Sequence, residues 1–273
     1  MKIIESFVLG KQGRADRCED GWVVTDAYAA VVDGSTSKLP PAEAAQRPKS
    51  GGRQAMEITL EAIRRLPPQA TKDEALSLLT AALRREMPPG ALERAERRLT
   101  CSAVVYSAER REVWMVGDCQ CRFGGRTYTH PKAVDAVLTR IRCDVIAYLL
   151  AHGHTEDELR RRDLGRAAIL DALREQTNFQ NDTNAFNPYR YPVLDGTPVD
   201  PAAVPVLPLG AARRLVLASD GYPDLLDTLA ATEDRLAALL RDDPLCYRLN
   251  PATKGLAEGN LSFDDRTYLS IEP

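Results

Sequence analysis

The chain has 273 residues, of which 44% are hydrophobic and 27% charged, and its net charge is −3. This length and composition are ordinary for a globular protein with a sizeable core. The charge balance gives no basic footprint for nucleic acid or an anionic membrane, and no run of about 18 apolar residues could span a bilayer.

Two β-strands are predicted near the N-terminus, at residues 3–9 and 22–33. Both segments are rich in β-branched and aromatic residues, and glycines lie at the joints between them. Apolar residues then recur at helical spacing between Met56 and Ile63. Pro67-Pro68 ends this amphipathic helix, because proline cannot continue the backbone hydrogen bonding.

The next segment is predicted as a second helix followed by a hairpin. Thr71 and Glu74 form a capping box ahead of an apolar stripe at residues 76–83. Residues 101–107 and 112–117 are β-rich and flank a charged connection, which is typical of a hairpin.

Beyond the hairpin the chain becomes helical. Apolar residues at helical spacing predict a long helix over 134–149, and Thr155 with Glu158 forms another capping box. An Asn/Pro-rich loop is expected from 177 to 208. We interpret residues 130–208 as a helical and loop insertion.

The C-terminal part returns to strands. A strand is predicted before Asp220, then a Leu-rich helix through Leu240 and a last strand at 266–271. Strands at both ends with helices between them favour an antiparallel α+β sandwich over a doubly wound parallel sheet. No linker-like stretch divides the chain, so residues 1–273 are expected to form a single domain.

Asp-Gly pairs occur four times, at residues 20, 33, 195 and 220. Asp-Gly is first of all a turn signal, and for the pair at 195, in the Pro-rich loop, a turn is the better interpretation. The pairs at 33 and 220 instead end apolar runs, as Asp118 does. Strands that end on carboxylates can bring them together in a sheet, and clustered carboxylates require protons or hard cations such as Mg²⁺ or Mn²⁺.

These acids resemble, in order, the motif set of the metal-dependent protein phosphatases of the PPM, or type 2C, family. The matching motifs are Glu19-Asp20, Asp33-Gly34, Val116-Gly117-Asp118, Ser219-Asp220-Gly221 with Asp224, and Asp264-Asp265-x-Thr267. The resemblance implies a four-layer αββα sandwich of two antiparallel sheets flanked by helices. It also implies a binuclear Mg²⁺ or Mn²⁺ centre between the sheets.

The resemblance assigns roles to the metal ligands by position. Asp33 would bridge both ions. Glu19 and the carbonyl of Gly34 would hold one ion, and Asp220 with Asp264 would hold the other.

Further roles follow from the same resemblance. Asp20 would orient the attacking water, and Asp118 with Asp224 or Asp220 would form a weaker third site. The implied reaction is hydrolysis of a phosphomonoester by metal-activated water, on a phosphoserine or phosphothreonine protein. A cognate Ser/Thr kinase or its target is the implied partner class.

The chain departs from the family pattern at three places. The usual phosphate-binding arginine is replaced by Ala15, so Arg14 or Arg17 is expected to serve, and either could reach the phosphate after a small loop adjustment. The residues after the first metal aspartate are Gly34-Ser35-Thr36-Ser37, and the third motif continues as Cys119-Gln120. These changes leave open a second function, that of a catalytically weak or inactive phosphatase-like binding module.

The cysteines and histidines offer another interpretation. A zinc site formed by Cys119, Cys121, His152 and His154 is conceivable, but neither pair has finger-like or ribbon-like spacing. Six cysteines in a chain of this length fit free thiols in a reducing compartment, so a cytoplasmic location is expected.

Overall fold

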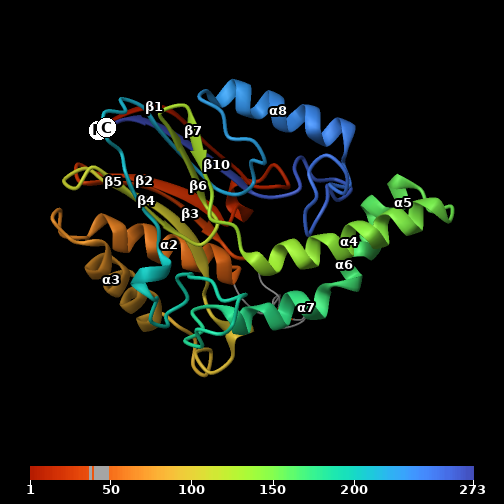
Figure 1. The fold of residues 1–273 in the computed structure, drawn as a ribbon, viewed down its shortest axis with the longest axis horizontal. Coiled ribbons are helices and arrows are strands. Elements are labelled where there is room, and N and C mark those ends of the chain that lie inside the picture. The colour runs from red at the N-terminus through yellow and green to blue at the C-terminus, as the bar shows by residue number, and fades with distance from the viewer. Residues whose placement is uncertain (37–38, 40–48) are drawn as a thin grey trace.

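The computed structural model describes residues 1–36, 39 and 49–273, so Ser37 of the motif after Asp33 lies outside the described residues. Within this part of the chain, two five-stranded antiparallel sheets pack face to face (Figure 1). One sheet has the order β1 (Lys2–Leu9), β10 (Arg266–Glu272), β9 (Leu215–Ala218), β6 (Gln120–Phe123) and β7 (Arg126–Tyr128). The other has the order β2 (Asp20–Val24), β3 (Tyr28–Gly34), β4 (Cys101–Ser107), β5 (Glu112–Val116) and β8 (Val206–Pro208).

The apolar run in β3 has no alternation because both faces of this strand are buried. Ala29 and Val31 belong to the core between the sheets, with Leu217 and Leu269 of the opposite sheet. The intervening residues of β3 face the other way, toward helices. A strand that is covered on both faces is expected to consist of a continuous run of apolar residues.

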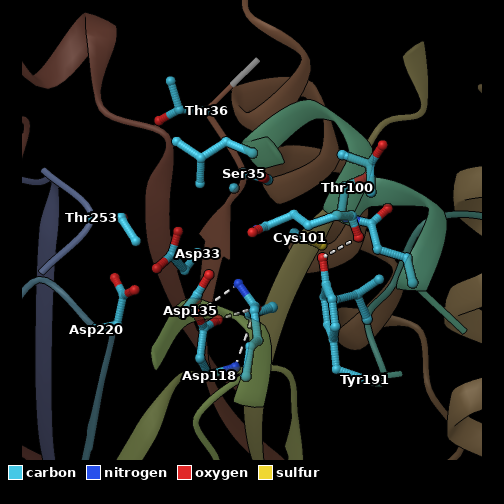
Figure 2. A pocket seen from close by; sticks show the side chains of 18 of the residues that line it. Asp33, Ser35, Thr36, Thr100, Cys101, Asp118, Asp135, Tyr191, Asp220 and Thr253 are labelled. Carbon is cyan, nitrogen blue, oxygen red and sulfur yellow. Dashed lines mark hydrogen bonds and ion pairs between the residues drawn. The ribbon is translucent and has the colours of Figure 1, made fainter. Parts of the chain in front are cut away.

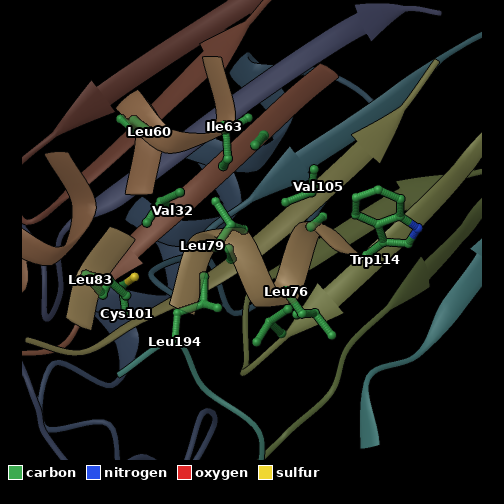
Figure 3. Close-up of a cluster of buried hydrophobic side chains, with 14 of the residues drawn as sticks. Val32, Leu60, Ile63, Leu76, Leu79, Leu83, Cys101, Val105, Trp114 and Leu194 are labelled. Atoms are coloured by element: carbon green, nitrogen blue, oxygen red, sulfur yellow. The ribbon is translucent and has the colours of Figure 1, made fainter. Parts of the chain in front are cut away.

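Helices cover the outer faces of both sheets. Helices α2 (Gly51–Arg64) and α3 (Lys72–Arg85) pack on one sheet, where Ile63, Leu79 and Val105 share a core (Figure 3). Helix α8 (Leu229–Asp242) packs on the other sheet through Leu236 and Leu240. The predicted four-layer αββα sandwich is therefore confirmed.

The local signals predicted several element boundaries correctly. Thr71 and Glu74 form the reciprocal capping box of α3, and Thr155 and Glu158 form that of α5 (Glu156–Arg161). The predicted hairpin is β4 and β5, which pair antiparallel. These boundaries depend on short-range contacts, which a sequence pattern encodes directly.

Other boundaries were wrong. The single strand expected at 22–33 is two strands, β2 and β3, which pair antiparallel across a turn where Thr25 Oγ1 accepts from the backbone N–H of Tyr28 at 2.9 Å. The hairpin of β6 and β7 was not predicted. The expected loop to residue 208 ends in strand β8, which pairs with β5.

The segment 130–208 contains its own helices and small cores. After α4 (Ala133–Ala151) and α5 come α6 (Leu164–Ala168) and α7 (Leu170–Glu175).

Short 3-10 helices occur along the whole chain, at Ala15–Arg17, Ala95–Arg97, Gln176–Phe179 and Pro201–Ala203. No helix in the described ranges is long and apolar enough to cross a membrane.

One buried arginine ties this segment to the C-terminal part of the chain. The Arg142 side chain on α4 is fully buried and makes five hydrogen bonds. Two go to Asp163 Oδ2, at 3.0 and 2.7 Å. The others go to the carbonyls of Leu245, Cys246 and Ala252. Every guanidinium N–H is thus satisfied, as a buried charge requires.

Candidate functional site

Carboxylates from both sheets and from α4 surround one small cavity of about 110 Å³. Asp33, Asp118, Asp135 and Asp220 lie around a common space (Figure 2). Asp264 also lines the cavity. The structure thus brings together acids that are up to 231 residues apart in sequence, from Asp33 to Asp264.

Glu19, Asp20 and Asp33 are placed by the pairing of β2 with β3. Asp20 and Asp33 are direct register partners, and the N–H of Gly34 donates to the carbonyl of Glu19 at 3.0 Å. Burial raises the pKa of both Asp20 and Asp33 well above the usual value, and neighbouring carboxylates raise it further. For Asp33 those neighbours include Asp20 and Asp220.

The glycines of the Asp-Gly pairs allow backbones to approach closely. A Cβ at Gly34 would collide with the carbonyl oxygen of Gly52 in the first turn of α2. A Cβ at Gly221 would collide with the carbonyl oxygen of Asp265. Neither Gly34 nor Gly221 has a positive φ, so close approach, not a turn, requires glycine here. The pair at 195 differs, because Gly196 has a φ of +79°, as the turn interpretation requires.

Asp118 is held on both sides of its carboxylate. Ser102 Oγ donates to Asp118 Oδ1 at 2.6 Å, and Lys132 Nζ lies 2.7 Å from Oδ2. Burial acts against the charged form, but Lys132 outweighs it and holds the pKa of Asp118 below the usual value. Gly117, with a φ of +83°, brings the strand end close to Ser102.

Two lysines lie among the remaining carboxylates. Lys254 Nζ forms an ion pair with Asp264 Oδ2, and Lys11 Nζ lies 3.6 Å from Asp264 Oδ1. Despite burial, these charges hold the pKa of Asp264 below the usual value. Asp265 has a positioning role, since it accepts from the backbone N–H groups of Lys11 and Glu19 at 2.8 Å each.

Asp220 lines the cavity and forms no ion pair with any residue that the structure describes. Its side chain keeps exposed surface toward the cavity, but the surrounding protein and the charges of Asp118 and Asp264 raise its pKa to about 7. The site therefore combines carboxylates in ion pairs, Asp118 and Asp264, with Asp33 and Asp220, which form no ion pair with any described residue.

The donor set fits the chemistry of hard divalent cations. Carboxylate and carbonyl oxygens are their preferred ligands. Glu19 Oε1 and Asp20 Oδ2 are buried and make no hydrogen bond to any described residue. Within the described ranges, no group of three or more Asp, Glu, His or Cys side chains is arranged so that it could bind a metal ion without rearrangement. The ammonium groups of Lys11, Lys132 and Lys254 lie among the carboxylates, so a cation at Asp264 would have to displace Lys254.

Five predicted residues do not line the acidic cavity: Glu19, Asp20, Arg14, Arg17 and Asp224. Glu19 and Asp20 are buried next to it, and Glu19 lines a neighbouring groove. Arg14 is exposed and pairs with Asp16 at 2.6 Å. Arg17 donates to Gln12 and lines a neighbouring groove beside Glu19. Asp224 pairs with Arg235 at 2.7 Å on the surface.

The conceivable zinc ligands are not gathered in a common site. Cys119 and Cys121 are buried in the core between the sheets, whereas His152 caps the C-terminal end of α4. All six cysteines are free and buried.

The sequence reasoning missed four charged residues of the cavity, which are Lys132, Asp135, Arg166 and Lys254. The first three lie in the segment 130–208, where charges at helical spacing look like a solvated helix face. Lys132 follows Pro131 and Arg166 follows Gly165, but these neighbours mark a helix start and a close packing contact, and neither points to the cavity.

Comparison with family models and with curated proteins gives no match. Among solved structures, the chain is similar to the serine/threonine phosphatase Stp1 from Staphylococcus aureus, at 14% identity, covering 100% of this chain and 96% of that chain, with a TM-score of 0.48. It is similar to the serine/threonine phosphatase PstP/Ppp of Mycobacterium tuberculosis, at 15% identity, covering 98% and 97%, with a TM-score of 0.46. It is also similar to the PPM Ser-Thr phosphatase MsPP from Mycobacterium smegmatis, at 15% identity, covering 100% and 99%, with a TM-score of 0.42.

The solved structures similar to this chain thus include PPM phosphatases, the family whose motifs its sequence resembles. At these identities and TM-scores the likeness assigns no activity to the chain.

Proposed function

We propose that the chain is a metal-dependent phosphomonoester hydrolase that acts on phosphoserine or phosphothreonine in proteins. The observation that carries the proposal is the meeting of Asp33 from one sheet with Asp220 and Asp264 from the other in a single cavity. Buried carboxylates of like charge repel each other, and such an arrangement is kept where cations compensate it.

Glu19, Asp33, Asp220, Asp264 and the Gly34 carbonyl would hold two Mg²⁺ or Mn²⁺ ions. Such ions supply Lewis-acid chemistry, which polarises a phosphoryl group and makes water a better nucleophile at neutral pH. Asp20, with Oδ2 free of other hydrogen bonds among the described residues, would orient the attacking water by accepting a hydrogen bond.

The surroundings of the acids support the same proposal. Asp265 fixes the backbone of Glu19, and Ser102 with Lys132 fixes Asp118 for a third, weaker cation. Phosphorylated proteins, including a kinase or its target, are the proposed partners. The free, buried cysteines support a reducing, cytoplasmic location.

A second candidate function has its own observation. The ion pair of Lys254 with Asp264, together with Lys11, gives Asp264 positive partners without any metal. A phosphatase-like binding module could keep its acidic cluster neutralised in this way and would need no bound cation.

One experiment separates the two functions. We would measure hydrolysis of p-nitrophenyl phosphate and calorimetric binding of Mn²⁺ for the native chain and for Asp33→Asn and Asp220→Asn. Asp224→Asn is the matched control, because Asp224 lies outside the cavity. The enzyme proposal expects Mn²⁺-dependent turnover that is lost in the first two variants only. A folded native chain that neither binds Mn²⁺ nor turns over would support the binding module.

A further inference from the structure

Arg166 occupies the junction of two cavities. It lines the acidic cavity together with Asp33, Asp220 and Asp264. It also lines a neighbouring cavity of about 240 Å³ next to Lys254 and Gly255. A guanidinium in this position can contact a molecule that enters either space.

The guanidinium of Arg166 forms no ion pair with a carboxylate of the described residues. Among the described residues, its side-chain partner is the carbonyl of Thr253, which accepts from Nη1 at 2.8 Å. Lys132 and Lys254, the other cations of the acidic cavity, are already paired with Asp118 and Asp264. Burial lowers the pKa of Arg166, although the charges of Asp163 and Asp264 act in the opposite direction.

The backbone beneath Arg166 is fixed. Asp163 is the N-cap of α6, and its Oδ1 accepts from the N–H of Arg166 at 2.7 Å. Its other oxygen, Oδ2, is held by the buried guanidinium of Arg142. Asp163 is therefore engaged by the helix start and by Arg142, which leaves the Arg166 side chain available to a ligand while its origin stays in place.

We propose that Arg166 binds the phosphate of the substrate. This inference rests on the proposed phosphatase function and replaces the expectation that Arg14 or Arg17 does so. The planar guanidinium matches two phosphate oxygens at once, and such charge-assisted pairs are the strong hydrogen bonds of proteins. Arg166 lines the same cavity as Asp33, Asp220 and Asp264, whereas Arg14 and Arg17 do not line it, and Arg17 lines the neighbouring groove beside Glu19.

The second cavity extends the inference to the rest of the substrate. Its charged lining residues are Lys11, Arg160, Arg161, Arg166, Lys254 and Asp163. Arg142 pairs with Asp163, and Lys11 and Lys254 lie beside Asp264, so the positive charge comes from Arg160, Arg166 and Arg161, whose exposed partner Glu258 is 4.0 Å away. A peptide whose phosphate lies at Arg166 would place its flanking residues here. Acidic flanks are therefore favoured over basic ones by electrostatic complementarity.

The test uses the full chain with inorganic phosphate as the probe, with and without Mn²⁺. We would compare Arg166→Gln, Arg166→Lys and the exposed control Arg162→Gln by calorimetry. Loss of a charge-assisted pair is expected to weaken phosphate binding by about 10-fold or more in Arg166→Gln, with partial rescue in Arg166→Lys. Mn²⁺ affinity and melting temperature are expected to stay at the native values in all three variants.

The outcomes separate this inference from the proposed function. Mn²⁺-dependent turnover with native phosphate affinity in Arg166→Gln would overturn the role of Arg166 and leave the enzyme standing. If the native chain shows no turnover but phosphate binding is weakened in Arg166→Gln, the phosphate-binding role of Arg166 is supported and the proposed enzymatic activity is contradicted. Absence of phosphate binding by the native chain under both conditions would overturn the role as well.

Phosphopeptides that differ only in their flanks test the second cavity. An acidic flank is expected to give a higher kcat/KM than a basic flank, and the ratio should shrink in an Arg160→Gln, Arg161→Gln double variant. Equal kcat/KM values for the two peptides would overturn the acidic preference.

Discussion

Asp20 and Asp33 are directly opposite each other on the antiparallel strands β2 and β3. Like charges directly opposite in a sheet destabilise it, and burial raises the pKa of both carboxyls well above the usual value. The strand pairing that builds the sandwich thus carries an electrostatic penalty at the end where the cavity lies.

Replacing Asp33 with asparagine should remove this repulsion. In metal-free buffer, Asp33→Asn is expected to raise the free energy of unfolding by about 1 kcal/mol. The same variant should lose the increase in melting temperature that Mn²⁺ gives the native chain, because Asp33 is a proposed ligand. Asp26→Asn, at the exposed turn between the same strands, is the control. A variant that is less stable than native without metal would contradict the repulsion.

Lys254 competes with any cation for the carboxylate of Asp264. We expect Lys254→Gln to be less stable than the native chain without metal, because Asp264 loses one of its two cationic partners and keeps only the more distant Lys11. Its melting temperature should rise more steeply with Mn²⁺ than that of the native chain. Thermal unfolding across a Mn²⁺ titration measures both effects, with the exposed Lys2→Gln as control. An unchanged Mn²⁺ response would show that Lys254 does not compete.

The glycines at the strand ends are required by packing. Gly34→Ala and Gly221→Ala should each lower the free energy of unfolding by about 1–3 kcal/mol, because the added methyl group meets a backbone carbonyl that cannot move freely. Denaturant unfolding gives the value, and Ser35→Ala on the exposed side of the same loop serves as control. If either glycine variant matched the native stability, close approach would not be the reason for glycine.

Arg142 should be among the most costly residues to replace. Arg142→Met leaves Asp163 and three carbonyls without their donor, and we expect a loss of about 3–5 kcal/mol in the free energy of unfolding. Arg140→Met, which removes an exposed pair with Asp144, should change stability by about 0.5 kcal/mol or less. Comparable losses in both variants would mean that the buried network contributes little.

Local signals in the sequence predicted many of the helices and strands, whereas the four-layer arrangement followed from the resemblance of the acidic motifs to a known family. Capping boxes at Thr71 and Thr155 and the apolar run of β3 each depend on residues close in sequence. The division of residues 22–33 into two strands was missed because the turn at Thr25 lacks glycine and proline. The hairpin of β6 and β7 could have been found, since Gly124 and Gly125 both have positive φ and form a typical two-residue turn.

Some residues of the candidate site could likewise be predicted from local sequence, and others could not. Asp33 and Asp220 could be chosen because each follows an apolar run, at the end of β3 and just after β9. Arg166 and Lys254 could not, because their place at the cavity depends on how α6 and the segment around Thr253 fold against distant residues. Long-range packing of this kind leaves no periodic trace in the sequence.

The buried guanidinium of Arg142 also limits how the segment 130–208 can be exchanged. Its partners lie both inside that segment, at Asp163, and well beyond it, at Leu245, Cys246 and Ala252. A chimaera in which this segment is grafted onto another sandwich would keep the contact of Arg142 with Asp163 but lose its contacts with the carbonyls of Leu245, Cys246 and Ala252. Residues 130–208 and 245–252 therefore form one structural unit, and a stable chimaera must exchange both segments together.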